Sequence, residues 1–358
     1  MPTPLPKVDS PEVQRIAHED PNNLSAYQLC LKYEEELVAF EDKLRYVRII
    51  GFLLLHAPNR VVRSEVTHCI HSCEHGSDLS DVGAYFERNV IVPLNKYRGR
   101  TPKPSGHPSR PSFEVEKDKV KVDITQAPKD HEEAKYHALV RDNWRCVATG
   151  TIDCRVPKHI AQLGPRTNAV YTQCAHIIPE ATYFGVIPKS KENNKLDYSA
   201  SILAVLKRFG YDIHSFNGKN VHSLTNVISM ESNVHDAFDR LMLYFEATAS
   251  FVKWFDHQPY PIMRERVQFS TWDPENLPVP SRKLLDLHAT CCKVAHLSGS
   301  AEYIDEIFRD ADELDILSAD GTSAAILDYL LLSSKPQDLE PQDSNLQLYY
   351  TPEPLMIS

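Results

Sequence analysis

Length, composition and charge place this chain among ordinary globular proteins. Its 358 residues, 42% hydrophobic and 25% charged, are enough for two domains with tails, and 8 cysteines are too few for a disulfide-stapled scaffold. No apolar run approaches the ~20 residues that cross a bilayer, and the N-terminus lacks the charged-then-apolar layout of a secretory signal. These features predict an intracellular protein of the nucleus or cytoplasm with no membrane partner.

The net charge of −10 argues at first against a nucleic-acid partner, because phosphate binding relies on lysine and arginine. The charge is unevenly spread, however. Residues 301–358 hold thirteen acids and two bases, whereas residues 141–260 hold thirteen bases and eleven acids. Five further bases without an acid lie just upstream, between Lys96 and Arg110. The sequence therefore leaves a near-neutral central region beside a basic arm.

The N-terminal part is expected to be helical after a disordered lead. Residues 1–23 are proline-rich and polar, which is typical of disorder. Apolar residues at helical spacing over 25–56 and 81–94 predict a helical domain over residues 24–95. Within it, Cys69 with Cys73 and His71 with His75 stand four residues apart and could bind zinc, but an ordinary helix with buried cysteine is favoured.

The remaining boundaries follow from composition. Residues 96–125 form a basic, proline-rich linker and extended segment that could track phosphate, act as a nuclear import signal or simply be a solvated linker, which is the default. A central domain is expected over residues 126–275, with a helix over 129–142, strands over 169–178 and 227–230, a small inserted helix over 203–209, and strand-like segments over 245–255 and 263–272. A C-terminal helical extension over 276–333 and a disordered acidic tail over 334–358 complete the chain.

Four short blocks of chemistry-bearing residues follow one another in the central domain. They are residues 141–150 (RDNWRCVATG), 174–179 (CAHIIP), 226–230 (NVISM) and 235–239 (HDAFD). In order and chemistry they resemble the blocks of HNH endonucleases, in the variety common in fungal proteins, and residues 284–305 resemble the helical extension that follows the domain in fungal members. The resemblance implies an α+β protein with a central ββα-metal nuclease domain between N-terminal and C-terminal helical regions.

The chemistry of phosphodiester hydrolysis suggests a role for each block. His176, near the end of a strand and before Pro179, can accept a proton from water at neutral pH and is the predicted general base. His235 is the predicted metal ligand, and Asp239, four residues on, shares its helical face and either joins the ion or orders the helix. By resemblance, Asn226 completes the catalytic set by pinning the loop between base and helix.

The predicted cofactor is one divalent metal ion. Mg²⁺ is favoured because it keeps several waters and is bridged by phosphate, while Mn²⁺ and Zn²⁺ suit a histidine ligand at least as well. Many HNH enzymes carry an additional metal ligand directly before the base, where this chain has Ala175. A structural zinc site at Cys146, Cys154 and Cys174, with His159 as a further ligand, is the weaker alternative.

Two functions from different classes remain open at this stage. The leading one is a metal-dependent endonuclease that acts on nucleic acid, with DNA favoured over RNA, through a water activated by His176. The alternative is a catalytically inactive HNH scaffold that binds nucleic acid or protein, suggested by Ala175 and the acidic C-terminus. The two differ in whether His176, Asn226 and His235 face one cleft. The sequence carries no signal for the oligomeric state.

Overall fold

The computed structural model describes residues 2–95, 132–157, 169–179, 194–246, 251–254, 263–264 and 266–313. In these ranges the chain combines many helices with two antiparallel strand pairs, in agreement with the predicted α+β class. None of the described helices is long and apolar enough to cross a membrane. The basic arm at 96–110, His159 and the acidic tail at 334–358 lie outside the described residues.

The N-terminal region is a group of helices around α3. Its apolar run from Ile49 to Leu55 is buried almost completely, and α3 packs against α2, α4 and α5. The approach of α5 to α3 is close enough that a Cβ atom at Gly83 would collide with the backbone of Tyr46, so glycine is required there. The elements of this region are α1 (Pro11–Glu19), α2 (Pro21–Glu36), α3 (Glu41–His56), α4 (Arg60–His71), α5 (Gly76–Phe86), the π-helical η1 (Glu87–Ile91) and α6 (Val92–Leu94).

The expectation of a disordered lead is wrong for its described residues. The helix α1 buries Val13 and Ile16, and it begins at Pro11, a position where proline fits because the first turn needs no backbone N–H. Ahead of it, Leu5 is buried over Gly51 and its backbone N–H donates to the Glu34 carboxylate at 3.1 Å. Proline content indicated disorder, but Pro11 and Pro21 start helices, and Leu5, Val13 and Ile16 are buried in the core.

The central region begins with helix α8 (Glu132–Arg141), which is fixed by a buried arginine. The guanidinium of Arg141 donates to the carbonyl oxygens of Leu224 (2.6 Å) and Val227 (2.8 Å) and pairs with Asp142. Asp142 in turn accepts from the backbone N–H of Ser229 at 3.0 Å. A buried charge is tolerated only when it is paired and hydrogen-bonded, and these contacts meet that condition while tying α8 to the second strand.

Two short strands and a helix follow one another in space. Strand β1 (Thr172–His176) pairs antiparallel with β2 (Val227–Glu231), so that His176 lies opposite Val227, and α11 (Ser232–Asp239) starts directly after β2 and contacts both strands. Both strands and the helix agree with the predicted positions. Between β1 and β2 lie α10 (Asn194–Arg208), which is longer than the expected inserted helix, and the short helical turns η3 (Ile213–Phe216), η4 (Gly218–His222) and η5 (Leu224–Asn226).

A buried carboxylate holds the start of β1. Asp153 accepts from the backbone N–H (2.8 Å) and hydroxyl (2.6 Å) of Thr172, and from the Arg155 guanidinium at 2.6 Å. Burial alone would raise the pKa of Asp153, but the hydrogen bonds from Arg155 and Thr172 outweigh it and hold that pKa well below its usual range. The folded structure thus stabilises the charged form of Asp153.

This arrangement predicts a specific loss of stability in acid. Because the folded pKa lies below the unfolded one, Asp153 stabilises the fold above about pH 4 and loses that contribution as the pH falls through the folded value. We expect Asp153→Asn to lower the free energy of unfolding by roughly 2 kcal/mol at pH 7 and to flatten the acid limb of stability below pH 4. Urea unfolding between pH 2.5 and 7 checks this. The exposed Asp236→Asn is the control, and an unchanged acid limb in the Asp153 variant would contradict it.

The C-terminal part begins with a hairpin and ends in two helices. Strands β3 (Leu243–Glu246) and β4 (Phe251–Trp254) pair antiparallel, and the pair begins two residues before the expected 245–255 region. The prediction of a strand over 263–272 is wrong, since the described residues of this segment form no strand. Val267 is nevertheless buried, and Phe269 packs on Phe245 with ring centroids 5.3 Å apart. Helices α12 (Arg282–Ser298) and α13 (Ser300–Glu313) meet at Gly299, whose φ of 86° permits the sharp turn.

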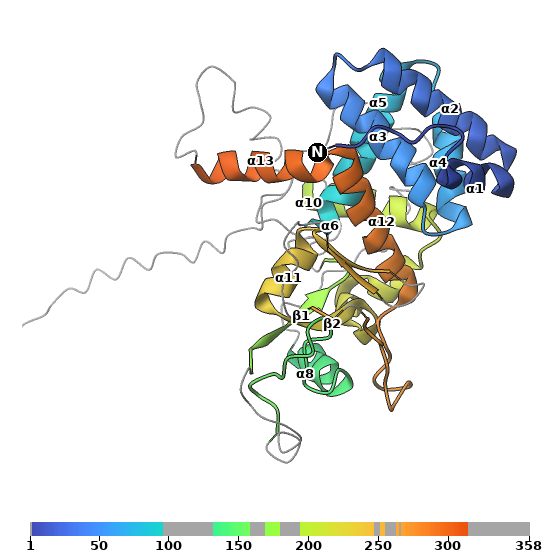
Figure 1. Cartoon of the computed structure of the whole chain (residues 1–358). Coiled ribbons are helices and arrows are strands. Elements are labelled where there is room, and N and C mark those ends of the chain that lie inside the picture. The colour runs from blue at the N-terminus through green and yellow to red at the C-terminus, as the bar shows by residue number, and fades with distance from the viewer. Residues whose placement is uncertain are drawn as a thin grey trace, which may run out of the picture.

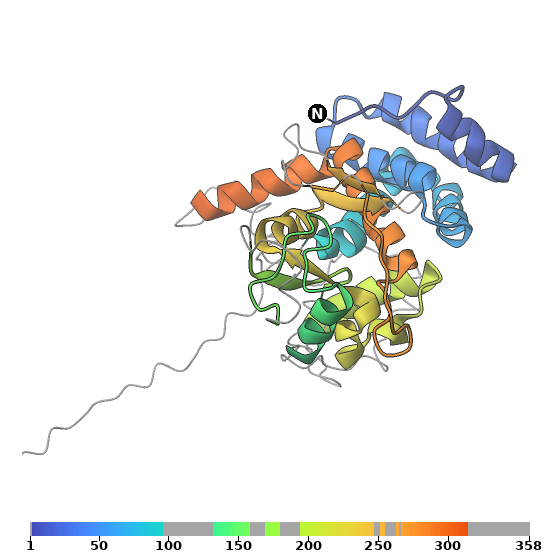
Figure 2. The same ribbon diagram turned by 60° about the horizontal axis from the view of Figure 1, so that its bottom comes forward.

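Helix α12 connects the two ends of the molecule. In Figure 1 the N-terminal helices gather at the top, and β1, β2, α8 and α11 lie below, with α12 between them. It packs against α3 on one side and β3 on the other, and the Thr290 hydroxyl donates to the His56 carbonyl at 2.9 Å. The second view shows α13 projecting away from this body (Figure 2). Buried residues of the N-terminal helices, the central strands and α12 belong to one continuous apolar core.

Candidate active site

His176 lies at the end of β1 and is paired with a second histidine. Its side chain is 4% exposed, and its Nε2 atom is 3.0 Å from Nδ1 of His222, at the end of η4. The two rings are 5.2 Å apart between centroids and meet edge to face. His222 is only half-buried, so it is the more exposed ring of the pair. The predicted base is therefore not an isolated imidazole.

Asn226 holds the two segments that carry these histidines. Its buried amide accepts from the Ile178 backbone N–H at 2.8 Å and donates to the carbonyl oxygens of Ile178 (3.0 Å) and Val221 (2.8 Å). Ile178 follows His176 by two residues and Val221 directly precedes His222. The amide thus extends the strand pairing by one rung and joins the segment after β1 to the segment before His222.

His235 and Asp239 lie together on α11. The Nδ1 atom of His235 is 2.6 Å from Oε1 of Gln173 on β1, and because an amide oxygen only accepts, the ring proton lies on Nδ1. In the neutral ring the lone pair is then on Nε2, an atom that is buried and makes no hydrogen bond to any residue that the structure describes. Oδ2 of Asp239 lies 3.2 Å from it. Two electron-pair donors side by side form an arrangement that a cation would satisfy.

The strand separates these groups into two clusters. Side chains alternate along β1, so Gln173 and Ala175 share the face that meets α11 and His176 points to the other face. Around His176 lie His222 and Asn226; on the α11 side lie Gln173, His235 and Asp239. The amide of Asn226 is committed to backbone groups and is therefore not turned toward a common cleft with the two predicted histidines.

The family model described as HNH endonuclease matches residues 146–246. The chain carries an HNH-family domain. A search of curated proteins and a search of solved structures each found no match. HNH domains belong to nucleases, which act on nucleic acids and generally use a divalent metal ion, so the match indicates a nuclease-type activity for this domain.

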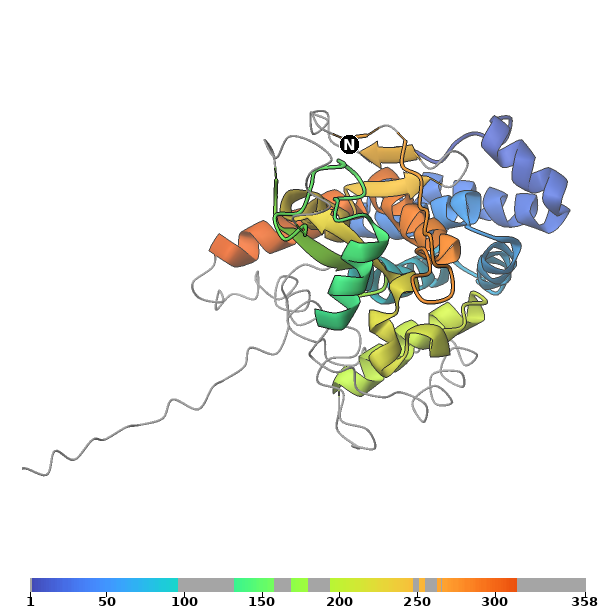
Figure 3. The same cartoon turned by 90° about the horizontal axis from the view of Figure 1, so that it is seen from below.

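The matched segment contains both clusters but not all of the helices that pack against their strands. It starts at Cys146, in the loop whose Val147 N–H donates to the Ser229 carbonyl of β2 at 3.0 Å, and it ends with β3. Helix α8 with Arg141 lies before it, and α12 lies after it. Figure 3 shows the HNH strands with α8 and α10 around them.

The zinc alternatives gain no support from the described residues. In this part of the chain, no group of three or more histidine, cysteine, aspartate or glutamate side chains is placed to hold a metal ion. Cys146 and Cys174 are buried while Cys154 is exposed. In the N-terminal helices, Nε2 of His71 lies 3.0 Å from the Ser25 hydroxyl. No disulfide joins the eight cysteines, all of which lie in described ranges.

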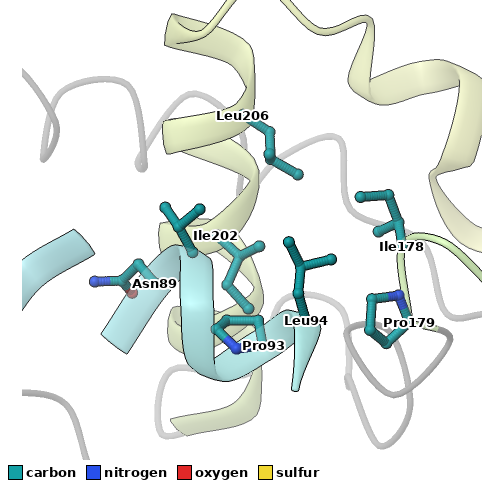
Figure 4. A pocket seen from close by; sticks show the side chains of 8 residues that line it. Asn89, Pro93, Leu94, Ile178, Pro179, Ile202 and Leu206 are labelled. Atoms are coloured by element: carbon teal, nitrogen blue, oxygen red, sulfur yellow. The ribbon is translucent and has the colours of Figure 1, made fainter. Parts of the chain in front are cut away.

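A small apolar pocket lies where the HNH domain meets the N-terminal helices. Ile178 and Pro179, just after β1, face Leu94 of α6 and Ile202 and Leu206 of α10 across it (Figure 4). The segment that follows His176 therefore lines this pocket together with residues from outside and inside the family match.

Sequence reasoning missed His222 and Gln173. His222 lies in a helical turn four residues before Asn226, and no spacing rule links it to a histidine 46 residues earlier. Gln173 had a usable signal, because alternation along a strand places it on the face of Ala175, where a metal ligand was expected.

Proposed function

We propose that the HNH domain hydrolyses phosphodiester bonds of nucleic acid, DNA in preference to RNA, with His176 as general base and a divalent cation held by His235 and Asp239. In this proposal β1, β2 and α11 form the ββα unit of this nuclease class. The observation that carries the proposal is the buried Nε2 atom of His235, 3.2 Å from the Asp239 carboxylate. Such a pair of donors is costly unless a proton or a cation lies between them.

The residues present fit a cation that keeps much of its water. His235 supplies a nitrogen ligand whose tautomer is fixed by Gln173, and Asp239 supplies an oxygen ligand. Ala175 would add none, so water and a substrate phosphate would have to supply the other ligands, which favours Mg²⁺ with Mn²⁺ and Zn²⁺ as alternatives. When bound, the ion neutralises charge that develops on the phosphate and on the leaving oxygen.

His176 supplies the proton transfer. A neutral imidazole at the end of β1 takes a proton from a water molecule as that water attacks phosphorus. Burial of the ring and its contact with His222 restrict its orientation, which reduces the entropy lost in reaching the transition state. Asn226 takes no part in the reaction itself and keeps the β1 end and η4 in register.

Removing His235 is expected to weaken metal binding and cleavage together. We expect His235→Ala to lower affinity for Mn²⁺ at least about tenfold in calorimetric titration of the full chain, and to lower plasmid cleavage in parallel. EDTA should stop cleavage by the unaltered protein, and Mg²⁺, Mn²⁺ or Zn²⁺ should restore it. His214→Ala, at an exposed histidine of η3, is the matched control. Unchanged Mn²⁺ affinity in the His235 variant would remove the metal assignment.

The second candidate is an inactive HNH scaffold that binds nucleic acid or protein. It is favoured by Ala175 and by the separation of the His176 and His235 contacts onto two faces of β1. Under this alternative the unaltered protein binds DNA in a low-salt mobility-shift assay but cuts neither plasmid nor single-stranded DNA with any of the three metals. Cleavage that is lost in His176→Ala excludes it.

A further inference from the structure

We propose that His222 is a positioning residue that fixes the tautomer of His176, by accepting a hydrogen bond from the Nε2–H of His176 at its own Nδ1 atom. The proposal rests on the function proposed above and identifies a residue that the HNH blocks in the sequence did not include. It is carried by the 3.0 Å contact between the two ring nitrogens.

The contact is built into the fold and is not a chance approach of surface side chains. His176 is nearly completely buried at the end of β1, and His222 closes the helical turn η4. The single amide of Asn226 bonds the backbone beside each of them, at Ile178 and at Val221. The distance between the two rings is therefore set by three hydrogen bonds to one buried side chain.

Only one direction of this hydrogen bond is compatible with a base at His176. If His222 donated, the proton of neutral His176 would lie on Nδ1 and both of its nitrogens would be used, leaving no lone pair for water. If His176 donates from Nε2, its Nδ1 carries the lone pair. Accepting from His176 also places the proton of neutral His222 on its own Nε2.

The reaction step then balances on named atoms. An O–H bond of water breaks and the proton binds Nδ1 of His176, while the water oxygen forms a bond to phosphorus. The P–O bond to the leaving oxygen breaks, and that oxygen takes the bonding electron pair and a proton from solvent. His176 becomes an imidazolium whose Nε2–H remains bonded to His222, and this hydrogen bond strengthens as the charge appears.

The test combines nitrogen NMR with two substitutions in the full chain. His222→Phe keeps a ring of similar size without an acceptor, and His222→Asn places an amide oxygen close to the position of Nδ1. In ¹⁵N-histidine-labelled protein, with the His176 signals assigned by their absence in His176→Ala, we expect the Nε2–H tautomer in the unaltered chain and in His222→Asn. In His222→Phe we expect the share of the Nδ1–H tautomer to rise.

Kinetics provide the second readout. We expect His222→Phe to lower kcat on the order of 10–100-fold with little change in KM, and His222→Asn to recover most of the loss. A structural role alone would not distinguish the two variants by tautomer. If His222→Phe fails to fold, which thermal unfolding reports, the tautomer of the unaltered chain still decides.

Three outcomes would overturn the inference. They are an Nδ1–H tautomer of His176 in the unaltered chain, an unchanged tautomer and kcat in folded His222→Phe, and stoichiometric Zn²⁺ binding that shifts both rings, which would make the pair a metal site. The tautomer is measured without substrate. An inactive protein with the expected tautomer would therefore sink the proposed nuclease function and leave the positioning role standing.

Discussion

Replacing His176 with alanine is expected to lower phosphodiester cleavage by roughly three orders of magnitude, because a positioned general base contributes about 10²–10⁴ to such a rate. The substitution deletes a nearly buried ring, but its partner His222 is half-buried and can turn to water. We therefore expect only a small change in the free energy of unfolding, about 1 kcal/mol. Plasmid nicking and thermal unfolding of the same preparation measure the two effects.

Two controls make the His176 result interpretable. Mn²⁺ affinity is expected to stay near that of the unaltered chain, because His235 and Asp239 bond on the other face of β1. The exposed His214→Ala should keep full cleavage. Cleavage by pure, folded His176→Ala at the unaltered rate would refute the assignment of the base.

Asn226→Asp is expected to produce the largest loss of stability among the changes considered. The two substituents are nearly the same size, but a carboxylate cannot donate, so the carbonyl oxygens of Ile178 and Val221 would face a buried negative charge. Each unsatisfied buried polar group costs about 1–3 kcal/mol, so we expect a loss of roughly 3–5 kcal/mol at pH 7 in urea unfolding. The ring contact between His176 and His222 should be lost with it.

The pH dependence of this variant supplies its control. Protonation of the new carboxyl group removes the charge, so part of the free energy of unfolding of Asn226→Asp should return as the pH is lowered toward 4.5. The unaltered chain should keep its free energy of unfolding at that pH. Asn220→Asp is the matched change, since the Asn220 amide is exposed and bonds only the His214 carbonyl among described residues. Equal stability of the two variants at pH 7 would show that the Asn226 amide does not fix the loop.

The central strands and helix could be predicted because their signals are local. Apolar runs bounded by Pro179 and by the polar start of α11 gave the positions of β1, β2 and α11, and the resemblance assigned His176 and His235 to them. Their partners could not be predicted in the same way. The contact of His222 with His176 depends on how α10 and three helical turns fold back, and that is a tertiary property without a sequence period.

The order of residues 1–23 could not be predicted from their own sequence either. Composition alone indicated disorder over residues 1–23, yet Leu5 and Ile16 are buried because α3 offers them a surface. A short segment with few apolar residues can be ordered by the body on which it lies, and its own sequence does not reveal that body. In contrast, the alternation of side chains along a strand places Gln173 on the same face as Ala175, and this could have been predicted from the sequence.

Helix α12 packs on elements both inside and outside the segment that the HNH family model matches. The HNH family match ends at Glu246, but β3, its last strand, packs on α12, which also packs on α3 at the other end of the chain. A segment cut at the borders of the match would expose the apolar side of β3 and lose the buried Arg141 that secures β2. The segment that the family model matches is therefore smaller than the packed core to which it belongs. Recombination that moved only the matched segment would transfer the HNH residues without the helices that hold them in place.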